Sequence, residues 1–502
     1  MSARTPRLIV FFTIDQLRPD YLTLFGPQFT GGLARLLRDG AVFPNGLQDH
    51  AITETAPGHA STMSGRFPRS TGIVANNAGV IDAQSPLLGA RGDGASPFRF
   101  RGTTLTDWLR YANPDTRALS VSRKDRGAIL PLGRAKQNVF WYATNGTFTT
   151  STYYADSLPD WVKRFNARRL PQSYAGKRWD LLLASSMYTE ADSVPTESGG
   201  LDFTFPHRFP TDSNQSAAAL MNMPMMDEVT LALALEGVRQ LGLGATDRTD
   251  VLAVSLSTTD AVGHRFGPDS REIHDQLVRL DRYLGAFLDS LFKLRDSNRI
   301  VIALTADHAV APLPESKSRY PNASAGRVNL GPVWNATRSR LLAAGADSNG
   351  IAFDESVLYL HPDALLPVGL KPDSVARVFA QEVAAVNGVL RVDLVRDLAT
   401  KDTTRDDVAR RWLHMLPPDV PAVATVTLKP YWYWAGVTYA THGSPHTYDA
   451  NVPIIIWGSR VKAGRYAQRV RVVDLAPTLA ELAGVRPMER LDGRILRDVL
   501  LP

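Results

Sequence analysis

The segment Leu8-Ile9-Val10-Phe11-Phe12-Thr13-Ile14, followed at once by Asp15, decides the fold class of this chain. Its residues are apolar or β-branched and do not alternate with polar ones, which is the pattern of a strand buried on both faces of a parallel sheet. Most of the other short apolar runs share this character: Ala118–Val121, Val251–Leu256, Ile300–Leu304 and Pro453–Trp457. Together they predict a mostly parallel central sheet.

Amphipathic helices separate these runs. Apolar residues from Ile273 to Leu291 recur at spacings of four and three, and the pair Asp269 and Ser270 is suited to cap the helix that they predict. A second predicted helix follows Asp474 and ends at Gly484. Strands that alternate with helices predict an α/β fold, with a doubly wound, mostly parallel sheet flanked by helices.

The length of 502 residues allows about three domains, although large α/β enzymes often form one core with long insertions. Two stretches, 83–216 and 309–440, interrupt the strand–helix pattern. We therefore expect a single domain, residues 1–502, with insertions or caps at these two places. The second stretch also contains a predicted strand–helix–strand unit, formed by Val357–Leu360, Ser374–Val386 and Val389–Val395.

Composition excludes several classes of function. The absence of cysteine removes disulfides, thiolate zinc sites, cysteine nucleophiles and iron–sulfur clusters. The net charge is +6, but Lys and Arg are scattered, which argues against a nucleic-acid partner and modestly favours anionic substrates. No apolar run approaches the roughly 18 residues of a membrane span, so no membrane partner is expected. No signal-peptide core precedes Leu8, so the sequence indicates either a cytosolic protein or a chain without its leader.

Carboxylates and imidazoles lie beside the predicted strands, mostly just after them: Asp15, Asp260, His264, Asp307, His308 and, ahead of the last strand, His442. Parallel sheets gather the carboxyl ends of their strands at one edge, where ligands bind. His nitrogen and Asp oxygen are common donors to Zn²⁺ in catalytic sites. Each residue alone has a simpler explanation as a helix cap, surface pair or turn. Their conjunction at several strand ends favours a site for two zinc ions.

A candidate nucleophile lies in Thr53-Glu54-Thr55-Ala56-Pro57. Pro57 suits the first turn of a helix, with Thr55 just before it. A hydroxyl at this place meets free backbone N–H groups and the positive end of the helix, both of which suit a phosphate. Zinc coordination would lower the pKa of that hydroxyl. Plain N-capping by Thr55, and Thr53 as the neighbouring nucleophile, remain alternatives.

The combined pattern resembles the alkaline phosphatase superfamily, in particular its type I phosphodiesterase/nucleotide pyrophosphatase-like branch. Within that branch it is most similar to the phosphate-irrepressible alkaline phosphatases that use a threonine nucleophile. The resemblance covers most of the predicted core and is carried by seven segments: Thr13–Gln16, Thr53–Gly65, Gly72–Asn77, Ser122–Gly127, Ser257–Asp260 with His264, Thr305–His308 and Thr441–Pro445.

The resemblance implies two Zn²⁺ ions as cofactors. One would be held by Asp15, Thr55, Asp307 and His308, and the other by Asp260, His264 and His442. It also implies that Asn76 contacts a phosphate oxygen, with the adjacent Asn77 as the alternative. His446 lies close to His442 but is not expected to bind metal.

Lys124 and Arg126 bear on the choice of substrate. Their Lys-x-Arg spacing is similar to that of monoesterases in this branch, and two cations suit the near-dianion of a monoester. Without the rest of the pattern, the same residues would be interpreted as a solvated basic turn. No Cys-x-Pro-x-Arg segment exists, which argues against sulfatase chemistry. The expected function is zinc-dependent hydrolysis of phosphate monoesters through a covalent phosphothreonine on Thr55.

Alternatives stay open. A phosphodiesterase or nucleotide pyrophosphatase with the same bimetal site would need a slot for a second substituent, for which Phe140–Tyr142 and Tyr431–Trp434 are candidates. A phosphonate hydrolase and a non-catalytic, metal-bound module with this fold are further alternatives. The resemblance implies a periplasmic or secreted protein, with the leader absent from this chain, that acts on small phosphate monoesters. A monomer is expected.

Overall fold

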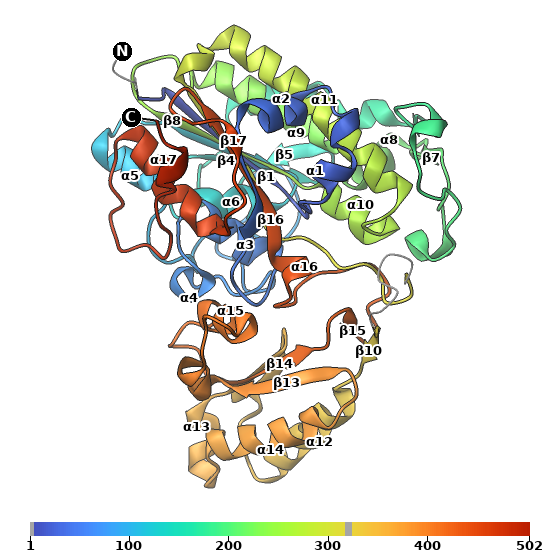
Figure 1. Ribbon diagram of the computed structural model, residues 1–502, viewed down its shortest axis with the longest axis vertical. Coiled ribbons are helices and arrows are strands. Elements are labelled where there is room, and N and C mark those ends of the chain that lie inside the picture. Colours follow the sequence, from blue (N-terminus) through green and yellow to red (C-terminus); the bar gives the residue numbers. More distant parts are fainter. Residues whose placement is uncertain (1–4, 317–323, 502) are drawn as a thin grey trace.

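The computed structural model describes residues 5–316 and 324–501. A central sheet of ten strands forms its main body (Figure 1). Along the sheet the strands follow the order β17 (Gly464–Arg465), β2 (Ala41–Leu47), β16 (Asn451–Gly458), β9 (Ile300–Thr305), β1 (Leu8–Ile14), β8 (Asp250–Leu256), β3 (Ala118–Ser122), β4 (Asn138–Ala143) and β5 (Thr147–Thr149), with β18 (Val470–Arg471) also paired to β2.

The middle of the sheet is parallel, as the apolar runs predict. Strand β1 lies between β8 and β9, with Leu8 aligned to Asp250 on one side and to Ile300 on the other. The residues that follow these strands therefore emerge at one edge. Strand β16 is antiparallel to β9, so the beginning of β16, rather than its end, lies at that edge. This direction accounts for a candidate ligand, His442, that precedes its strand.

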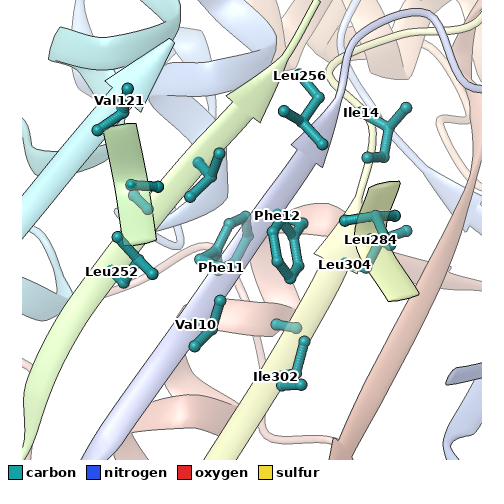
Figure 2. Packing of buried hydrophobic residues seen from close by; sticks show 14 of the residues in the cluster. Val10, Phe11, Phe12, Ile14, Val121, Leu252, Leu256, Leu284, Ile302 and Leu304 are labelled. Carbon is teal, nitrogen blue, oxygen red and sulfur yellow. The ribbon is translucent and has the colours of Figure 1, made fainter. Parts of the chain in front are cut away.

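Helices cover both faces of the sheet, which confirms the predicted fold class (Figure 1). One group comprises α2 (Gly32–Asp39), α9 (Met225–Gln240), α10 (Thr258–Phe266) and α11 (Arg271–Leu294), and the other α3 (Thr55–Thr62), α5 (Leu105–Ala112), α6 (Asp125–Ile129) and α17 (Leu475–Ala483). Figure 2 shows the packing between sheet and helix, where Phe11 and Phe12 of β1 are surrounded by apolar side chains of the neighbouring strands and Leu284 of α11 is also shown. Phe12 also meets Phe287 of α11 edge to face.

The two helices predicted from periodicity are present. Helix α11 has Ser270 as its N-cap, and the Ser270 hydroxyl accepts a hydrogen bond from the Ile273 N–H, as the capping pair predicts. Helix α17 ends at Gly484 in the left-handed conformation (φ 70°), which glycine adopts without steric penalty.

A separate lobe, here called the cap lobe (residues 326–434), lies at one end of the main body (Figure 1). It has its own hydrophobic cluster and a four-stranded antiparallel sheet. Its elements are β10 (Gly326–Val328), α12 (Gly331–Ala343), β11 (Ile351–Asp354), β12 (Val357–Leu360), α13 (Pro362–Leu365), α14 (Pro372–Ala384), β13 (Val389–Leu394), α15 (Asp407–Met415), β14 (Ala422–Leu428) and β15 (Trp432–Trp434). The predicted strand–helix–strand unit is thus β12, α14 and β13.

The first stretch that the sequence marks as an insertion also contributes to the core, because β3, β4 and β5 belong to the central sheet. The remaining short elements there and elsewhere are α1 (Tyr21–Leu24), α4 (Pro68–Thr71), α7 (Asp160–Ala167), β6 (Arg178–Trp179), β7 (His207–Arg208), α8 (Ser213–Ala219) and α16 (Thr447–Ala450). Along the described residues, no helix is both long and apolar enough to cross a lipid bilayer.

Candidate active site and metal centre

The carboxylates that the sequence singles out meet at one edge of the sheet. Asp15 directly follows β1, Asp307 lies two residues beyond β9, and Asp260 lies in the first turn of α10 after β8. All three are buried. Burial, together with the charges of the other two, raises the pKa of Asp15. Three buried carboxylates this close require positive charge between them.

Three histidines face the carboxylates, each with one nitrogen anchored to a backbone carbonyl. Nδ1 lies 2.9 Å from the Ala309 oxygen in His308, 2.5 Å from the Ala440 oxygen in His264 and 2.7 Å from the Thr53 oxygen in His442. A carbonyl accepts, so Nδ1 carries the proton and Nε2 points toward the carboxylates. Such anchoring orients histidines that ligate metals and fixes their tautomer.

The Nε2 atoms lie close to carboxylate oxygens. His264 Nε2 is 3.0 Å and His442 Nε2 is 3.6 Å from Oδ1 of Asp260. Burial alone would lower the pKa of His442, but its hydrogen bond to Asp260 and the charge of that carboxylate raise the pKa to about 9. The helical spacing of Asp260 and His264 places both side chains on the same face of α10.

The donor set fits metal ions. His308 Nε2 and Asp15 Oδ1 face each other at 3.4 Å, and within the described part of the chain neither atom has a hydrogen-bond partner. Two buried lone pairs that face each other are unfavourable unless a cation lies between them. Ligand atoms lie within 4.8 Å of one another in two groups: Asp15, Asp307 and His308, and Asp260, His308 and His442. Nitrogen and carboxylate donors suit Zn²⁺ among several divalent metals.

Gln16 supports two of these carboxylates, a role that the sequence does not indicate. Its backbone N–H donates to Asp307 Oδ1 at 3.2 Å, and its side-chain amide donates to Asp260 Oδ1 at 2.9 Å. Gln16 adopts a positive φ of 65°, a strained conformation for a residue with a side chain. This conformation turns the chain after β1 so that Asp15 and Gln16 both serve the site.

Thr55 begins helix α3 and is buried at the site. The prediction placed Thr55 immediately before the helix; instead it is the first helical residue and Glu54, in extended conformation, is the cap. The Glu54 carbonyl accepts from the Gly58 N–H at 3.0 Å, which moves the helix start one residue earlier. Thr55 therefore lies in the first turn, at the positive end of the helix.

Thr53, the alternative nucleophile, is engaged elsewhere. Its hydroxyl donates to the Ser444 carbonyl at 2.9 Å and accepts from the Gly443 N–H at 3.2 Å. These bonds tie the segment before α3 to the segment that carries His442. The Thr55 hydroxyl, by contrast, accepts a hydrogen bond from Lys124 Nζ at 3.1 Å. Of the two hydroxyls, that of Thr55 is the one in the cavity.

Lys124 connects the hydroxyl to the carboxylates. Its ammonium lies 2.6 Å from Asp15 and 2.7 Å from Asp260. Arg126 lines the same cavity, and its Nε has no hydrogen-bond partner among the described residues. Arg123, next in sequence to Lys124, is buried with Nη2 4.0 Å from Asp260. The turn after β3 and the start of α6 thus carry three cations at the site, of which the sequence prediction included two.

Asn76 lines the cavity, whereas Asn77 is exposed and donates to Asp354 of the cap lobe at 2.9 Å. The Asn76 side-chain oxygen accepts from the Ala56 N–H at 2.9 Å, and its own backbone N–H donates to Glu54 at 2.8 Å. The side-chain amide of Asn76 thereby lies beside the start of α3. This geometry favours Asn76 over its neighbour as the residue that faces a ligand.

The cavity over Thr55 has a volume of about 570 Å³. This is large for a phosphate group alone, and Tyr439, Arg265 and Asn222 form part of the remaining wall. Neither aromatic segment proposed as a slot for a second substituent contributes to it. Phe140–Tyr142 is buried within β4, and Tyr433 is buried with its hydroxyl 2.8 Å from the Ala311 carbonyl.

His446 is directed away from this cavity. Its Nε2 lies 2.8 Å from the Leu428 carbonyl of the cap lobe. Asp449 instead supports the segment with His442, because it accepts from both the hydroxyl and the N–H of Ser444. Metal binding by His446 is therefore not indicated by this geometry.

The chain is similar to known proteins over most of its length. A family model described as type I phosphodiesterase / nucleotide pyrophosphatase matches residues 9–449. Alkaline phosphatase PhoV of Synechococcus elongatus is 31% identical over 99% of this chain and 93% of its own. Alkaline phosphatase PhoK of Sphingomonas sp is 30% identical over 99% of this chain and 92% of its own.

A solved structure of an alkaline phosphatase is also similar to this chain. The crystal structure of wild-type alkaline phosphatase PafA superposes with a TM-score of 0.89 at 27% identity, and all of both chains is covered. PafA of Elizabethkingia meningoseptica is 28% identical in sequence over 99% of this chain. Because the family model spans most of the chain and the relatives align over nearly their full lengths, this chain belongs to the type I phosphodiesterase/nucleotide pyrophosphatase family.

Proposed function

We propose that this protein is an alkaline phosphatase that hydrolyses phosphate monoesters to an alcohol and inorganic phosphate through a covalent phosphothreonine on Thr55. The observation that carries the proposal is the position of the Thr55 hydroxyl. It lies at the helix N-terminus, bonded to Lys124, in the same cavity as the cluster of buried carboxylates and histidines. Relatives named alkaline phosphatase that align over almost the whole chain support the same activity.

Seven residues would hold two zinc ions: Asp15, Thr55, Asp307 and His308 for one, and Asp260, His264 and His442 for the other. When bound, such ions would lower the pKa of the nucleophilic hydroxyl and stabilise charge on the entering and leaving oxygens. The anchored Nδ1 atoms of the three histidines hold the ligand nitrogens in place without rearrangement.

Side chains of this protein would supply the nucleophile and bind the phosphoryl group. Thr55 attacks phosphorus in line with the leaving oxygen, and the phosphothreonine is then hydrolysed by water from the opposite side. The equatorial oxygens keep most of the charge in a loose transition state. Asn76 and Lys124 lie beside Thr55 and would donate hydrogen bonds to these oxygens, and Arg126 adds a second cation.

Preference for monoesters follows from charge. A monoester carries close to two negative charges and a diester carries one, so each added cation at the phosphate site favours the monoester. Lys124, Arg126 and Arg123 all line the cavity, and Nη2 of Arg123 lies 4.0 Å from Asp260. The runner-up, a phosphodiesterase or nucleotide pyrophosphatase with the same metals, needs a slot for the second substituent. The two aromatic segments first considered for this slot lie outside the cavity wall.

Zinc-loaded enzyme assayed on p-nitrophenyl phosphate and bis-p-nitrophenyl phosphate tests this proposal. We expect a large preference in kcat/KM for the monoester. A preference for the diester would overturn the monoesterase assignment, and hydrolysis of neither ester at full metal occupancy would revive a non-catalytic role. Small phosphate monoesters as substrates, a periplasmic or secreted location and a monomeric state are parts of the same proposal that this assay does not address.

A further inference from the structure

Tyr439 is a half-exposed aromatic residue in the wall of the active-site cavity. The residue is 51% exposed, and it lines the same cavity as Thr55 and Lys124. Ligand pockets are lined largely by hydrophobic and aromatic side chains, so an aromatic ring in the wall of this cavity is placed to contact a ligand. Neither the sequence pattern nor the proposed mechanism gives Tyr439 a role.

Tyr439 is held in a fixed position relative to one metal-ligand candidate. Its ring meets the His264 imidazole edge to face, with centroids 5.4 Å apart and an interplanar angle of 83°. The next residue, Ala440, is fully buried, and its carbonyl accepts from His264 Nδ1 at 2.5 Å. The aromatic ring and the imidazole are therefore positioned together, so Tyr439 is preorganised rather than loosely attached.

The position of Tyr439 corresponds to the leaving-group side of the cavity. Thr55, Lys124 and Asn76 gather on the phosphate side. Under the proposed function, on which this step rests, His264 belongs to the metal site that stabilises the leaving oxygen. A group attached to that oxygen would therefore lie against the wall beside His264, which is where Tyr439 lies.

The charge on this wall is compensated. Arg265 lines the cavity beside His264, but its guanidinium donates to Asp202 at 3.0 Å and to Ser198 at 2.8 Å. The cation is already paired, so the wall does not select for a second anionic group on the leaving side. What it offers instead is the exposed aromatic surface of Tyr439.

We infer that Tyr439 forms a stacking platform for planar aromatic leaving groups, and that aryl phosphates are favoured over alkyl phosphates at this site. Aromatic rings that pack against one another gain free energy beyond the area that they bury. An alkyl group would gain only the apolar contact. The platform therefore increases the specificity for monoesters in which the phosphate oxygen is attached directly to an aromatic ring.

The test compares kcat/KM for phenyl phosphate and ethyl phosphate in wild type and in Tyr439 variants. Because each variant is compared with wild type on both substrates, the different reactivities of the two esters cancel. Tyr439→Leu, which keeps apolar bulk, is expected to lower the phenyl-to-ethyl ratio of kcat/KM about 3- to 10-fold. Tyr439→Phe, which keeps the ring, should retain the wild-type ratio. Tyr111→Leu, at an exposed tyrosine on α5, is the matched control and should also leave the ratio unchanged.

An equal loss on both substrates in Tyr439→Leu, or an unchanged ratio, would overturn the platform. Tyr439→Met, which also keeps apolar bulk, provides the same comparison if the leucine variant does not fold. Calorimetry of phenylphosphonate and ethylphosphonate binding to zinc-loaded protein needs no turnover. From wild type to Tyr439→Leu, the ratio of the two affinities is expected to change by the same 3- to 10-fold. If wild type hydrolyses neither ester, the proposed function fails, whereas the platform is still judged by the two binding affinities.

Discussion

Lys124 donates a hydrogen bond from Nζ to Oγ1 of Thr55 at 3.1 Å, and the two residues lie 69 positions apart in the chain. The same ammonium is within 2.7 Å of carboxylate oxygens of Asp15 and Asp260. One cation thus contacts both the candidate nucleophile and the residues expected to hold metal. This contact joins the turn after β3 to the start of α3 and defines the phosphate side of the cavity.

Replacement of this cation should impair monoester hydrolysis selectively. Lys124→Ala is expected to reduce kcat/KM for a phosphate monoester about 10- to 100-fold, since a hydrogen bond to a charged group contributes roughly 1.5–3 kcal/mol. The loss for a diester should be smaller, because a diester has less charge to neutralise. Steady-state assays on p-nitrophenyl phosphate and its bis ester check this. Equal losses on both substrates would show that Lys124 does not discriminate by charge.

Close packing between α3 and the end of β9 should make Gly58 sensitive to substitution. A Cβ at Gly58 would lie 2.2 Å from the Asp307 carbonyl oxygen and 2.7 Å from the Asp307 Cβ. Both distances are shorter than non-bonded contacts allow, so one of the two segments would have to move. Gly58→Ala should therefore displace Asp307, lower zinc content and cost about 1–3 kcal/mol of stability. Atomic absorption and thermal unfolding measure both effects. Gly26→Ala, where nothing lies within 4 Å of the added Cβ, is the control; a normal zinc content in Gly58→Ala would contradict the prediction.

Gln16 should affect metal affinity rather than folding alone. Its two hydrogen bonds orient Asp260 and Asp307, and the loss of such supporting contacts typically weakens metal binding 10- to 100-fold. Gln16→Ala retains only the backbone bond, so we expect zinc affinity to fall about 10-fold in competition with a chelator. Gln84→Ala, at an exposed position, should retain wild-type affinity. Unchanged affinity in Gln16→Ala would limit Gln16 to a structural role.

Asp49 should make stability depend on pH below its ordinary titration range. Burial would raise the pKa of Asp49, but its hydrogen bonds to His414 and Arg410 of α15 dominate and lower that pKa. A carboxylate with a depressed folded-state pKa stabilises the protein above its unfolded pKa of about 3.9, and the contribution is lost as the pH falls toward the folded value.

Asp49→Asn is accordingly expected to destabilise the protein by about 2 kcal/mol at pH 7, with the difference from wild type shrinking below about pH 4. Urea unfolding at a series of pH values measures the two free energies. A difference that stays constant down to the acid limit would show that the ion pair does not contribute through its charge.

Much of the fold could be predicted because its central strands are continuous apolar runs. Leu8–Ile14 and Ile300–Thr305 lie side by side in the buried sheet, and their composition alone marks them as strands. Strand β2 was not predicted, since Pro44 and Gly46 interrupt its apolar pattern. The antiparallel direction of β16 was not predicted either, because a local run carries no information about which neighbour it pairs with or in what sense.

Most of the candidate ligands could be proposed from the sequence for a related reason: they follow strands, or recur at helical spacing as Asp260 and His264 do, and His442 alone precedes its strand. Gln16 and Tyr439 follow no such rule. Gln16 reaches the site because of its positive φ, which its residue type does not predict. Tyr439 lines the cavity because of the path that the chain takes between β15 and α16. Residues of this kind depend on tertiary packing and cannot be recognised from local pattern.

The identity of the nucleophile is tested most directly by acid-quenching the zinc-loaded enzyme during turnover of a phosphate monoester and locating the phosphoryl group by mass spectrometry. The account predicts one phosphoryl group on Thr55 in wild type, none in Thr55→Ala, and loss of turnover in that variant with fold and zinc content close to normal. Thr53→Ala should still form the phosphothreonine. Phosphorylation of Thr53 or of another residue, or wild-type activity in Thr55→Ala, would contradict the account.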